Sequence, residues 1–211
     1  ERVALYRQTF LAPTLAAAAA PLLVLIELGA AVDVLQAAGY TVLLPPGEAC
    51  CGLTWISTGQ LGTAKRKLGR LLSTLAPFAA SGVPIVGVEP SCTAVLRSDL
   101  EDLLPDDARA PLVKAMTYTL AELLTAPEPV GPGRGWRMPD LAGVEIVAQP
   151  HCHHYSVMGW AADEDLLRKA GASVTKVTGC CGLAGNFGME KGHYEVSVKV
   201  AQARLVPALS E

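Results

Sequence analysis

The element CCGL occurs twice in the sequence, within EACCGLTW at residues 48–55 and within VTGCCGLAGNFG at residues 177–188. In an extended strand, neighbouring side chains point to opposite faces of the sheet, so two adjacent cysteines cannot serve one centre there. A turn in which the following glycine adopts a positive φ allows both sulfur atoms to face the same region. We therefore predict that Gly52 and Gly182 each form a turn that presents a pair of thiols.

The chain around these elements alternates between strand patterns and helix patterns. Short apolar runs predict strands at residues 2–10, 40–44, 83–90, 144–151 and 173–178. Helical patterns predict an Ala/Leu-rich helix that ends at Gly39, a helix that buries Leu68, Leu71, Leu72 and Leu75, and helices at residues 112–124, 163–172 and 190–209. This alternation is typical of an α/β fold built on parallel sheets.

The two halves of the chain follow the same order: strand, helix, AAGY or KAGA, strand, CCGL and helix. We therefore predict an α/β fold of two related lobes, each a parallel sheet flanked by helices. The expected boundaries are a first lobe at residues 1–125, a Pro/Gly-rich linker at residues 126–143, and a second lobe at residues 144–211 that lacks its C-terminal part. Because the carboxyl ends of parallel strands meet at one edge, both doublets, Cys92 and Cys152 should gather there.

Charge and hydropathy exclude two classes of protein. The 17 Lys and Arg residues against 20 Asp and Glu residues give a formal net charge of −3, which offers no electrostatic footprint for nucleic acid. The longest apolar run, residues 11–26, contains two prolines and is shorter than the roughly 20 residues of a spanning helix. We expect a cytoplasmic protein without a transmembrane segment.

The cysteines are more typical of metal or redox chemistry than of a disulfide scaffold. Four of the 6 cysteines stand in adjacent pairs, and a disulfide between neighbours closes a strained ring. Converging thiolates repel one another and require a cation, which an iron–sulfur cluster or zinc supplies. The candidate ligands are Cys152, Cys180 and Cys181, together with Cys50, Cys51 and Cys92.

The histidines of the HCHH element flank Cys152 and leave three roles open. Imidazole beside thiolate suits zinc or iron, so one or two of these side chains are candidate ligands. Because histidine titrates near neutral pH, His151 and His154 are also the candidates for proton transfer during catalysis. The third role is that of an ordinary surface or helix-capping residue.

Four elements together resemble the cysteine-rich CCG domain found in heterodisulfide reductase, the glycolate oxidase iron–sulfur subunit, lactate-utilisation proteins and anaerobic glycerol-3-phosphate dehydrogenase. These elements are EACCGLTWISTGQL at residues 48–61, VEPSC at 88–92, QPHCHHYSVMG at 149–159 and GCCGLAGNFG at 179–188. The sequence is most similar to the C-terminal region of bacterial FAD-linked oxidases of the D-lactate or D-2-hydroxyglutarate dehydrogenase type. In those proteins an FAD-binding domain and a ferredoxin-like segment precede this region.

The resemblance implies that each repeat supplies a lone cysteine, a doublet and a C-x-x-C motif to an iron–sulfur cluster of 4Fe–4S type. In the second repeat Cys152 matches the lone cysteine, and Cys180 and Cys181 match the doublet. In the first repeat the doublet is Cys50 and Cys51, and Cys92 matches the last cysteine of C-x-x-C.

Both ligand sets depart from the family pattern. The first repeat has no lone cysteine in YRQTFLAP at residues 6–13, and Glu89 stands at the first position of C-x-x-C. The second repeat ends before its own C-x-x-C. Each set is therefore expected to be incomplete in this chain, unless Cys92 and the doublets share one centre or a histidine fills a vacancy.

Three functions remain open from the sequence. The resemblance implies an oxidoreductase module that carries electrons from FAD on another domain, of the same or a partner chain, through iron–sulfur centres to the CCG site. The electron acceptor stays open, and a peripheral association with the respiratory chain at the inner face of the membrane is compatible with this role. A second possibility is a thiol/disulfide reductase in which a doublet thiolate attacks a substrate sulfur directly. A third is a non-catalytic docking domain with structural zinc or no metal. We expect the isolated chain to be inactive.

Overall fold

A computed structural model of the 211-residue chain describes residues 2–6, 29–46, 50–184 and 187–209. The chain divides into two compact units, which we call unit 1 (Glu1–Arg137) and unit 2 (Met138–Glu211). Their boundary falls inside the linker that the sequence predicts at residues 126–143. The apolar run at residues 11–26 and most of YRQTFLAP lie outside the described residues.

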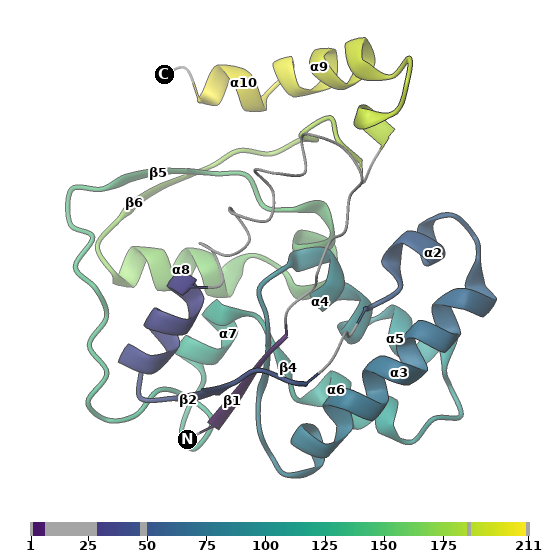
Figure 1. Ribbon diagram of the computed structural model, residues 1–211. Helices are drawn as coiled ribbons and strands as arrows, with labels where there is room; N and C mark the ends of the chain where they lie inside the picture. Colours follow the sequence, from purple (N-terminus) through teal and green to yellow (C-terminus); the bar gives the residue numbers. More distant parts are fainter. Residues whose placement is uncertain (1, 7–28, 47–49, 185–186, 210–211) are drawn as a thin grey trace. The chain divides into compact units, whose positions relative to one another are not determined.

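Unit 1 contains a parallel sheet of four strands in the order β2-β1-β3-β4 (Figure 1). The strands are β1 (Arg2–Tyr6), β2 (Thr41–Leu43), β3 (Ile85–Gly87) and β4 (Thr117–Tyr118). Strand β1 pairs with β2 from Arg2↔Thr41 and with β3 from Ala4↔Ile85. Because β2 and β3 flank β1, the segments that follow these two strands leave the sheet at its carboxyl edge on either side of β1.

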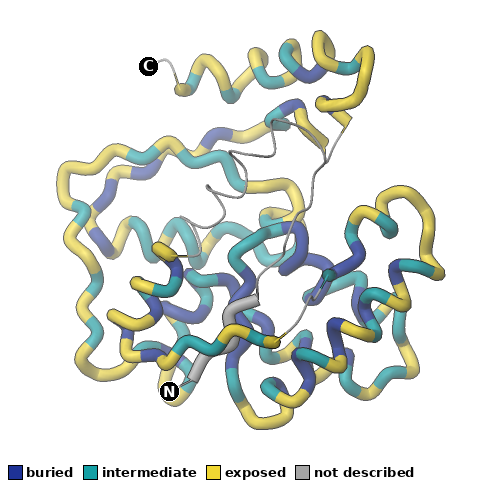
Figure 2. The backbone as a smooth tube through the Cα atoms, viewed as in Figure 1, coloured by how far each residue is buried: buried dark blue, intermediate teal, exposed yellow. Residues whose placement is uncertain are grey.

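The long helix beyond the first CCGL element forms one side of the core of unit 1. This helix, α3 (Leu61–Ala80), buries Leu68, Leu71, Leu72 and Leu75 completely, as their spacing predicts. It contacts α5 (Asp99–Leu103) and α6 (Arg109–Ala115) (Figure 1), and Figure 2 shows its buried side in dark blue. The core of unit 1 also contains Cys51 and Cys92.

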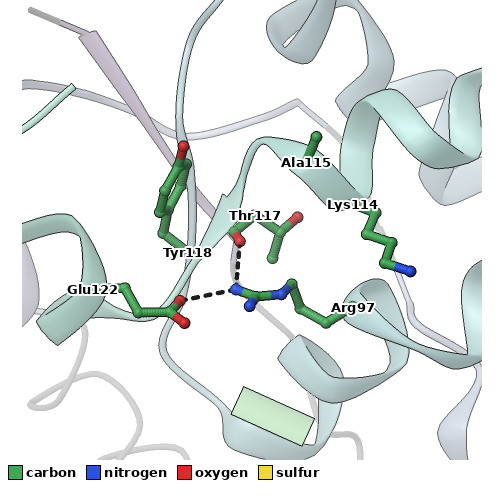
Figure 3. Close-up of a pocket in the computed structure, with 6 residues that line it drawn as sticks. All are labelled: Arg97, Lys114, Ala115, Thr117, Tyr118 and Glu122. Carbon is green, nitrogen blue, oxygen red and sulfur yellow. Dashed lines mark hydrogen bonds and ion pairs between the residues drawn. The ribbon is translucent and has the colours of Figure 1, made fainter. Parts of the chain in front are cut away.

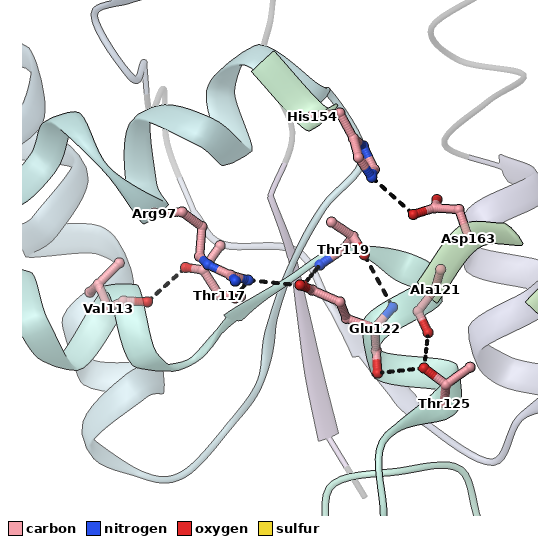
Figure 4. Close-up of polar contacts among 9 residues, drawn as sticks. All are labelled: Arg97, Val113, Thr117, Thr119, Ala121, Glu122, Thr125, His154 and Asp163. Carbon is pink, nitrogen blue, oxygen red and sulfur yellow. Dashed lines mark hydrogen bonds and ion pairs between the residues drawn. The ribbon is translucent and has the colours of Figure 1, made fainter. Parts of the chain in front are cut away.

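The helix predicted at residues 112–124 is wrong, because the chain forms α6, the short strand β4 and a new helix, α7 (Leu120–Thr125). Thr119 and Glu122 form a capping box that starts α7. The Thr119 hydroxyl accepts the Glu122 N–H at 3.1 Å, and the Glu122 carboxylate accepts the Thr119 N–H at 2.9 Å (Figure 4). Glu122 also binds Arg97 at 2.8 Å, which ties α7 to α4 (Pro90–Arg97).

Unit 2 contains two parallel strands, β5 (Glu145–Ala148) and β6 (Ser173–Lys176), which pair in register from Glu145↔Ser173. The connection between them contains a π-helical turn, η2 (His154–Met158), and helix α8 (Ala161–Lys169). Strand β6 leads through the second CCGL element to the short 3₁₀ helix η3 (Phe187–Met189). The predicted order of strand, helix and strand in this half is confirmed.

The helix predicted at residues 190–209 is interrupted. The structure has α9 (Tyr194–Gln202) and α10 (Leu205–Ala208), with Arg204 at φ −145° between them. Pro207 explains the break, since a proline ring collides with the carbonyl group four residues earlier, which here belongs to Ala203.

Helices in both units end at a glycine that leads into the next strand. At Gly39, which has φ +92°, the N–H of Tyr40 donates to the carbonyl of Leu35 at 3.0 Å. At Gly171, which has φ +94°, the N–H of Ala172 donates to the carbonyl of Leu167 at 3.1 Å. Both are Schellman motifs, and the one at Gly39 confirms the predicted helix end.

The α/β class is confirmed, with small parallel sheets flanked by helices. The relation of the two units as repeats stays a prediction, which their shared order of elements supports. Among the helices that the structure describes, none has the length and apolar character needed to cross a membrane.

Thr119→Ala should lower the free energy of unfolding by about 1–2 kcal/mol, because α7 loses the hydroxyl that caps a buried helix start. Thr58→Ala is the control, since the Thr58 hydroxyl binds the Thr54 carbonyl at an exposed position, and its effect should stay within about 0.5 kcal/mol. Urea unfolding followed by circular dichroism measures both. Equal effects of the two changes would contradict the capping role.

Candidate cysteine site

The first CCG turn follows β2 and begins helix α2 (Leu53–Ser57). Gly52 adopts φ +77°, and its N–H donates to Cys50 Sγ at 3.4 Å. A Cβ atom at Gly52 would stand 3.4 Å from the Cα and carbonyl oxygen of Ala64, a buried residue of α3. The glycine thus provides both the left-handed backbone and a close approach to the next long helix.

The second CCG turn, after β6, has the same local geometry. Gly182 adopts φ +90°, and its N–H donates to Cys180 Sγ at 3.3 Å. The Ser197 hydroxyl of α9 donates to the Gly182 carbonyl at 2.8 Å, and a Cβ at Gly182 would lie 2.2 Å from the Ser197 carbonyl oxygen. The positive φ predicted for both glycines is therefore confirmed.

In unit 1 the second cysteine of the doublet meets a cysteine from another element. Cys51 Sγ lies 2.9 Å from Sγ of Cys92, and the two residues are 0% and 1% exposed. Cys51 lies in the CCG turn between β2 and α2, whereas Cys92 lies in the first turn of α4, after β3. The structure thus brings together two of the cysteines that the sequence places at the carboxyl edge of one sheet.

Glu89, which stands where the family pattern has a cysteine, caps helix α4. Its carboxylate accepts the N–H groups of Ser91 at 3.0 Å and Cys92 at 2.6 Å. Pro90 follows at the first helical position, where a missing N–H costs nothing. The sequence Glu-Pro-Ser could have predicted this cap, and the cap gives Glu89 a structural role in place of a sulfur ligand.

The contact between the two sulfur atoms shifts the pKa values of the two thiols in opposite directions. The hydrogen bond between the two sulfur atoms lowers the pKa of Cys51, although burial acts against this shift. The same hydrogen bond raises the pKa of Cys92, and burial raises it further. Cys51 is therefore the thiol of the pair that loses its proton more readily.

A metal ion does not fit between Cys51 and Cys92 as they stand. Two thiolates on one tetrahedral zinc ion, each about 2.3 Å from the metal, would be about 3.8 Å apart. The observed separation is 2.9 Å, and both sulfur atoms are closed off from solvent. Among the described residues, no three His, Cys, Asp or Glu side chains converge as a metal-binding group.

The cysteines of unit 2 are more open. Cys152 follows β5 and is exposed, whereas Cys180 and Cys181 are half-buried. Because no three donors converge in the described part of the chain, the predicted set of Cys152, Cys180 and Cys181 is not assembled into a ligand cage here. Its role as a ligand set stays a prediction.

His154 and His151 have different surroundings. His154, whose side chain is 11% exposed, lies 2.9 Å from the carboxylate of Asp163 in the first turn of α8 (Figure 4). The exposed His151 accepts the backbone N–H of His153 through Nδ1 at 3.2 Å. No sequence signal pointed to Asp163 as the partner of His154, because the pairing depends on the π-helical turn between them. The proposed proton-transfer role of either histidine stays a prediction.

A hollow of about 400 Å³ in unit 1 is lined by Arg97, Lys114, Ala115, Thr117, Tyr118 and Glu122 (Figure 3). Its charged groups are already paired. Arg97 binds Glu122 and the carbonyl of Thr117, and Lys114 binds Glu101. The Arg97 contacts hold α4, β4 and α7 together. We therefore assign these charged residues a role in packing and not in ligand binding.

Comparison with known proteins confirms the resemblance. Residues 28–97 match the cysteine-rich domain CCG. The chain is 29% identical to D-2-hydroxyglutarate dehydrogenase of Pseudomonas putida, over 81% of this chain and 16% of that protein. It is 28% identical to one subunit of the anaerobic glycerol-3-phosphate dehydrogenase of Escherichia coli, over 79% of this chain and 41% of that protein.

A third relative is named for an iron–sulfur function. The chain is 26% identical to the probable glycolate oxidase iron–sulfur subunit of Bacillus subtilis, over 83% of this chain and 40% of that protein. The chain therefore spans less than half the length of each of these three relatives. All three are named as dehydrogenases or oxidases or as subunits of them, which is consistent with an oxidoreductase context for the CCG elements.

Alanine at either CCG glycine should destabilise its unit. Gly52→Ala should cost roughly 1–2 kcal/mol, because alanine resists a positive φ but has room there. Gly182→Ala should cost at least about twice as much, since its Cβ would also collide with the Ser197 carbonyl. Gly69→Ala, in open space within α3, is the control and should be neutral or stabilising. Chemical denaturation tests the order, which a larger loss for Gly52→Ala would contradict.

The rate of thiol labelling should distinguish the buried pair Cys51 and Cys92 from the more accessible cysteines. N-ethylmaleimide should label the exposed Cys152 first and the half-buried Cys50 more slowly. Cys51 and Cys92 should react at least about 100-fold more slowly than Cys50, because labelling requires local opening of the core. Mass spectrometry of peptides after timed quenching measures each rate. Similar rates at Cys50 and Cys51 would show that the second cysteine does not point into the core.

Proposed function

We propose that this chain is the cysteine-rich electron-transfer module of an FAD-linked dehydrogenase or oxidase that acts on 2-hydroxy acids. The observation that carries the proposal is the pair of CCG turns. Both have a glycine at positive φ whose N–H binds the first cysteine sulfur, at 3.4 Å in unit 1 and 3.3 Å in unit 2. The turn thus fixes the direction of the first cysteine sulfur of each doublet, and cysteine sulfur is the ligand that holds iron–sulfur clusters.

The relatives support the choice of reaction class. Their names specify a dehydrogenase of D-2-hydroxyglutarate, a subunit of glycerol-3-phosphate dehydrogenase and an iron–sulfur subunit of glycolate oxidase. Two of these three substrates are 2-hydroxy acids. Since the chain matches only part of each relative, we assign substrate binding and FAD to other parts of the protein or to a partner chain.

Within this module we assign cluster binding to unit 2. Cys180 and Cys181 are half-buried and Cys152 is exposed, so their sulfur atoms are accessible to an incoming cluster of 4Fe–4S type. The described residues alone do not form a complete ligand set, and we assign the remaining ligands to other parts of the protein or to a partner chain. Unit 1 lacks both the lone cysteine and the first cysteine of C-x-x-C, and Cys51 and Cys92 face each other.

The test compares two matched variants of the full-length protein, purified without oxygen. Cys180→Ser should remove the iron and acid-labile sulfide of one cluster, and it should slow 2-hydroxy-acid-dependent reduction of a dye. Cys50→Ser should leave iron and sulfide at the wild-type level, although Cys50 occupies the same position in its own CCG turn.

Other outcomes would contradict the proposal in distinguishable ways. Iron loss in Cys50→Ser alone would move the cluster to unit 1. A colourless wild-type protein that contains zinc would support the docking domain. A wild-type protein without metal whose doublet thiols turn over disulfides would support the thiol/disulfide reductase.

A further inference from the structure

We propose that Cys51 and Cys92 form a reversible disulfide, a redox site of unit 1 that is separate from the cluster site assigned to unit 2. The two sulfur atoms are 2.9 Å apart, closer than non-bonded sulfur atoms normally approach and longer than the S–S bond of about 2.05 Å. Bond formation therefore needs only a small approach of the two side chains.

The surroundings of the pair hold the sulfur atoms against each other. Cys51 is fixed by the turn at Gly52, which packs on Ala64 of α3. Cys92 is fixed by α4, whose first N–H groups are bound by Glu89. Helices α2 and α4 are in contact, and both cysteines belong to the apolar core of unit 1. Such positioning raises the effective concentration of one thiol beside the other by orders of magnitude.

The departures from the family pattern favour this use of the two cysteines. With glutamate in place of the first C-x-x-C cysteine, the carboxylate of Glu89 binds backbone N–H groups and not a metal. The three cysteines that remain in unit 1 are too few for the family's ligand set, and the two buried ones already contact each other. The two thiols can therefore still form a disulfide, although unit 1 has too few cysteines for the family's ligand set.

Burial determines which oxidant reaches the pair. With exposures of 0% and 1%, the sulfur atoms exclude reagents as large as glutathione disulfide, whereas hydrogen peroxide is close to water in size. The Cys51 thiolate attacks one peroxide oxygen, the O–O bond breaks, and the hydroxide that leaves takes up a proton, so that Cys51 becomes a sulfenic acid. Cys92 then loses its proton and attacks the Cys51 sulfur, the S–O bond breaks, and a second water leaves.

In total, the two thiols lose two electrons and two protons, and one hydrogen peroxide becomes two water molecules. When the core opens locally, a dithiol reverses the reaction by exchange and is itself oxidised to a disulfide. The bridge would join the CCG turn to α4 across 41 residues of sequence. Oxidation should therefore lower the equilibrium constant for unfolding of unit 1 by roughly 30- to 1000-fold.

Peptide mapping of the full-length protein tests this inference. The reduced protein is treated with hydrogen peroxide, denatured in acid, blocked with N-ethylmaleimide and digested. The expected product is a peptide pair that joins Cys51 to Cys92, lighter by two hydrogen atoms than the two reduced peptides together. Dithiothreitol should separate the pair.

Two variants serve as controls. Cys50→Ser should retain the cross-link between Cys51 and Cys92, whereas Cys51→Ser should lose it, with circular dichroism confirming that both variants fold. The inference is overturned if the wild type yields blocked Cys51 and Cys92, or if peroxide joins Cys51 to Cys50 instead. Because the wild-type cross-link does not depend on iron, absence of a cluster would refute the proposed function and leave this result unchanged.

Discussion

The glycine of each CCG turn is the constraint on which the cysteine site depends. At a positive φ the chain leaves its strand and turns. In unit 1 the turn leaves Cys50 half-buried and Cys51 buried, whereas in unit 2 Cys180 and Cys181 are both half-buried. Gly52 lies against Ala64, the fourth residue of α3, and Gly182 lies against Ser197, the fourth residue of α9. A side chain would strain the backbone at both positions, and at Gly182 it would also collide with Ser197. The N–H of the glycine then points at the sulfur of the first cysteine.

The same type of CCG turn occurs in both units, but the cysteines have different surroundings because the neighbouring strands and helices differ. In unit 1 a third strand, β3, leads into α4, and α4 brings Cys92 against Cys51 in the core. In the described part of unit 2, β5 and β6 have no such neighbour, and Cys181 stays half-buried. We therefore propose thiol chemistry for the unit with the closed pair and cluster binding for the unit whose thiols are accessible.

The sequence predicts what depends on local pattern. Five of the six described strands, the buried leucines of α3, the helix end at Gly39 and the two glycine turns follow from periodicity and from residues that favour a particular φ, whereas β4 was missed. The break at Ala203 and the capping box at Thr119 also had local signals, namely Pro207 and Glu122, which the apolar periodicity outweighed. The contact of Cys51 with Cys92 and that of His154 with Asp163 had no such signal, because tertiary packing brings these side chains together.

The central claim is that the same turn serves metal binding in unit 2 but not in unit 1. The most direct measurement is the iron and acid-labile sulfide content of the intact protein in which Cys50, Cys51 and Cys92 are all replaced by alanine. We expect the folded triple variant to retain the wild-type content of both. Loss of a cluster from that variant would show that unit 1 supplies ligands, and it would contradict the account.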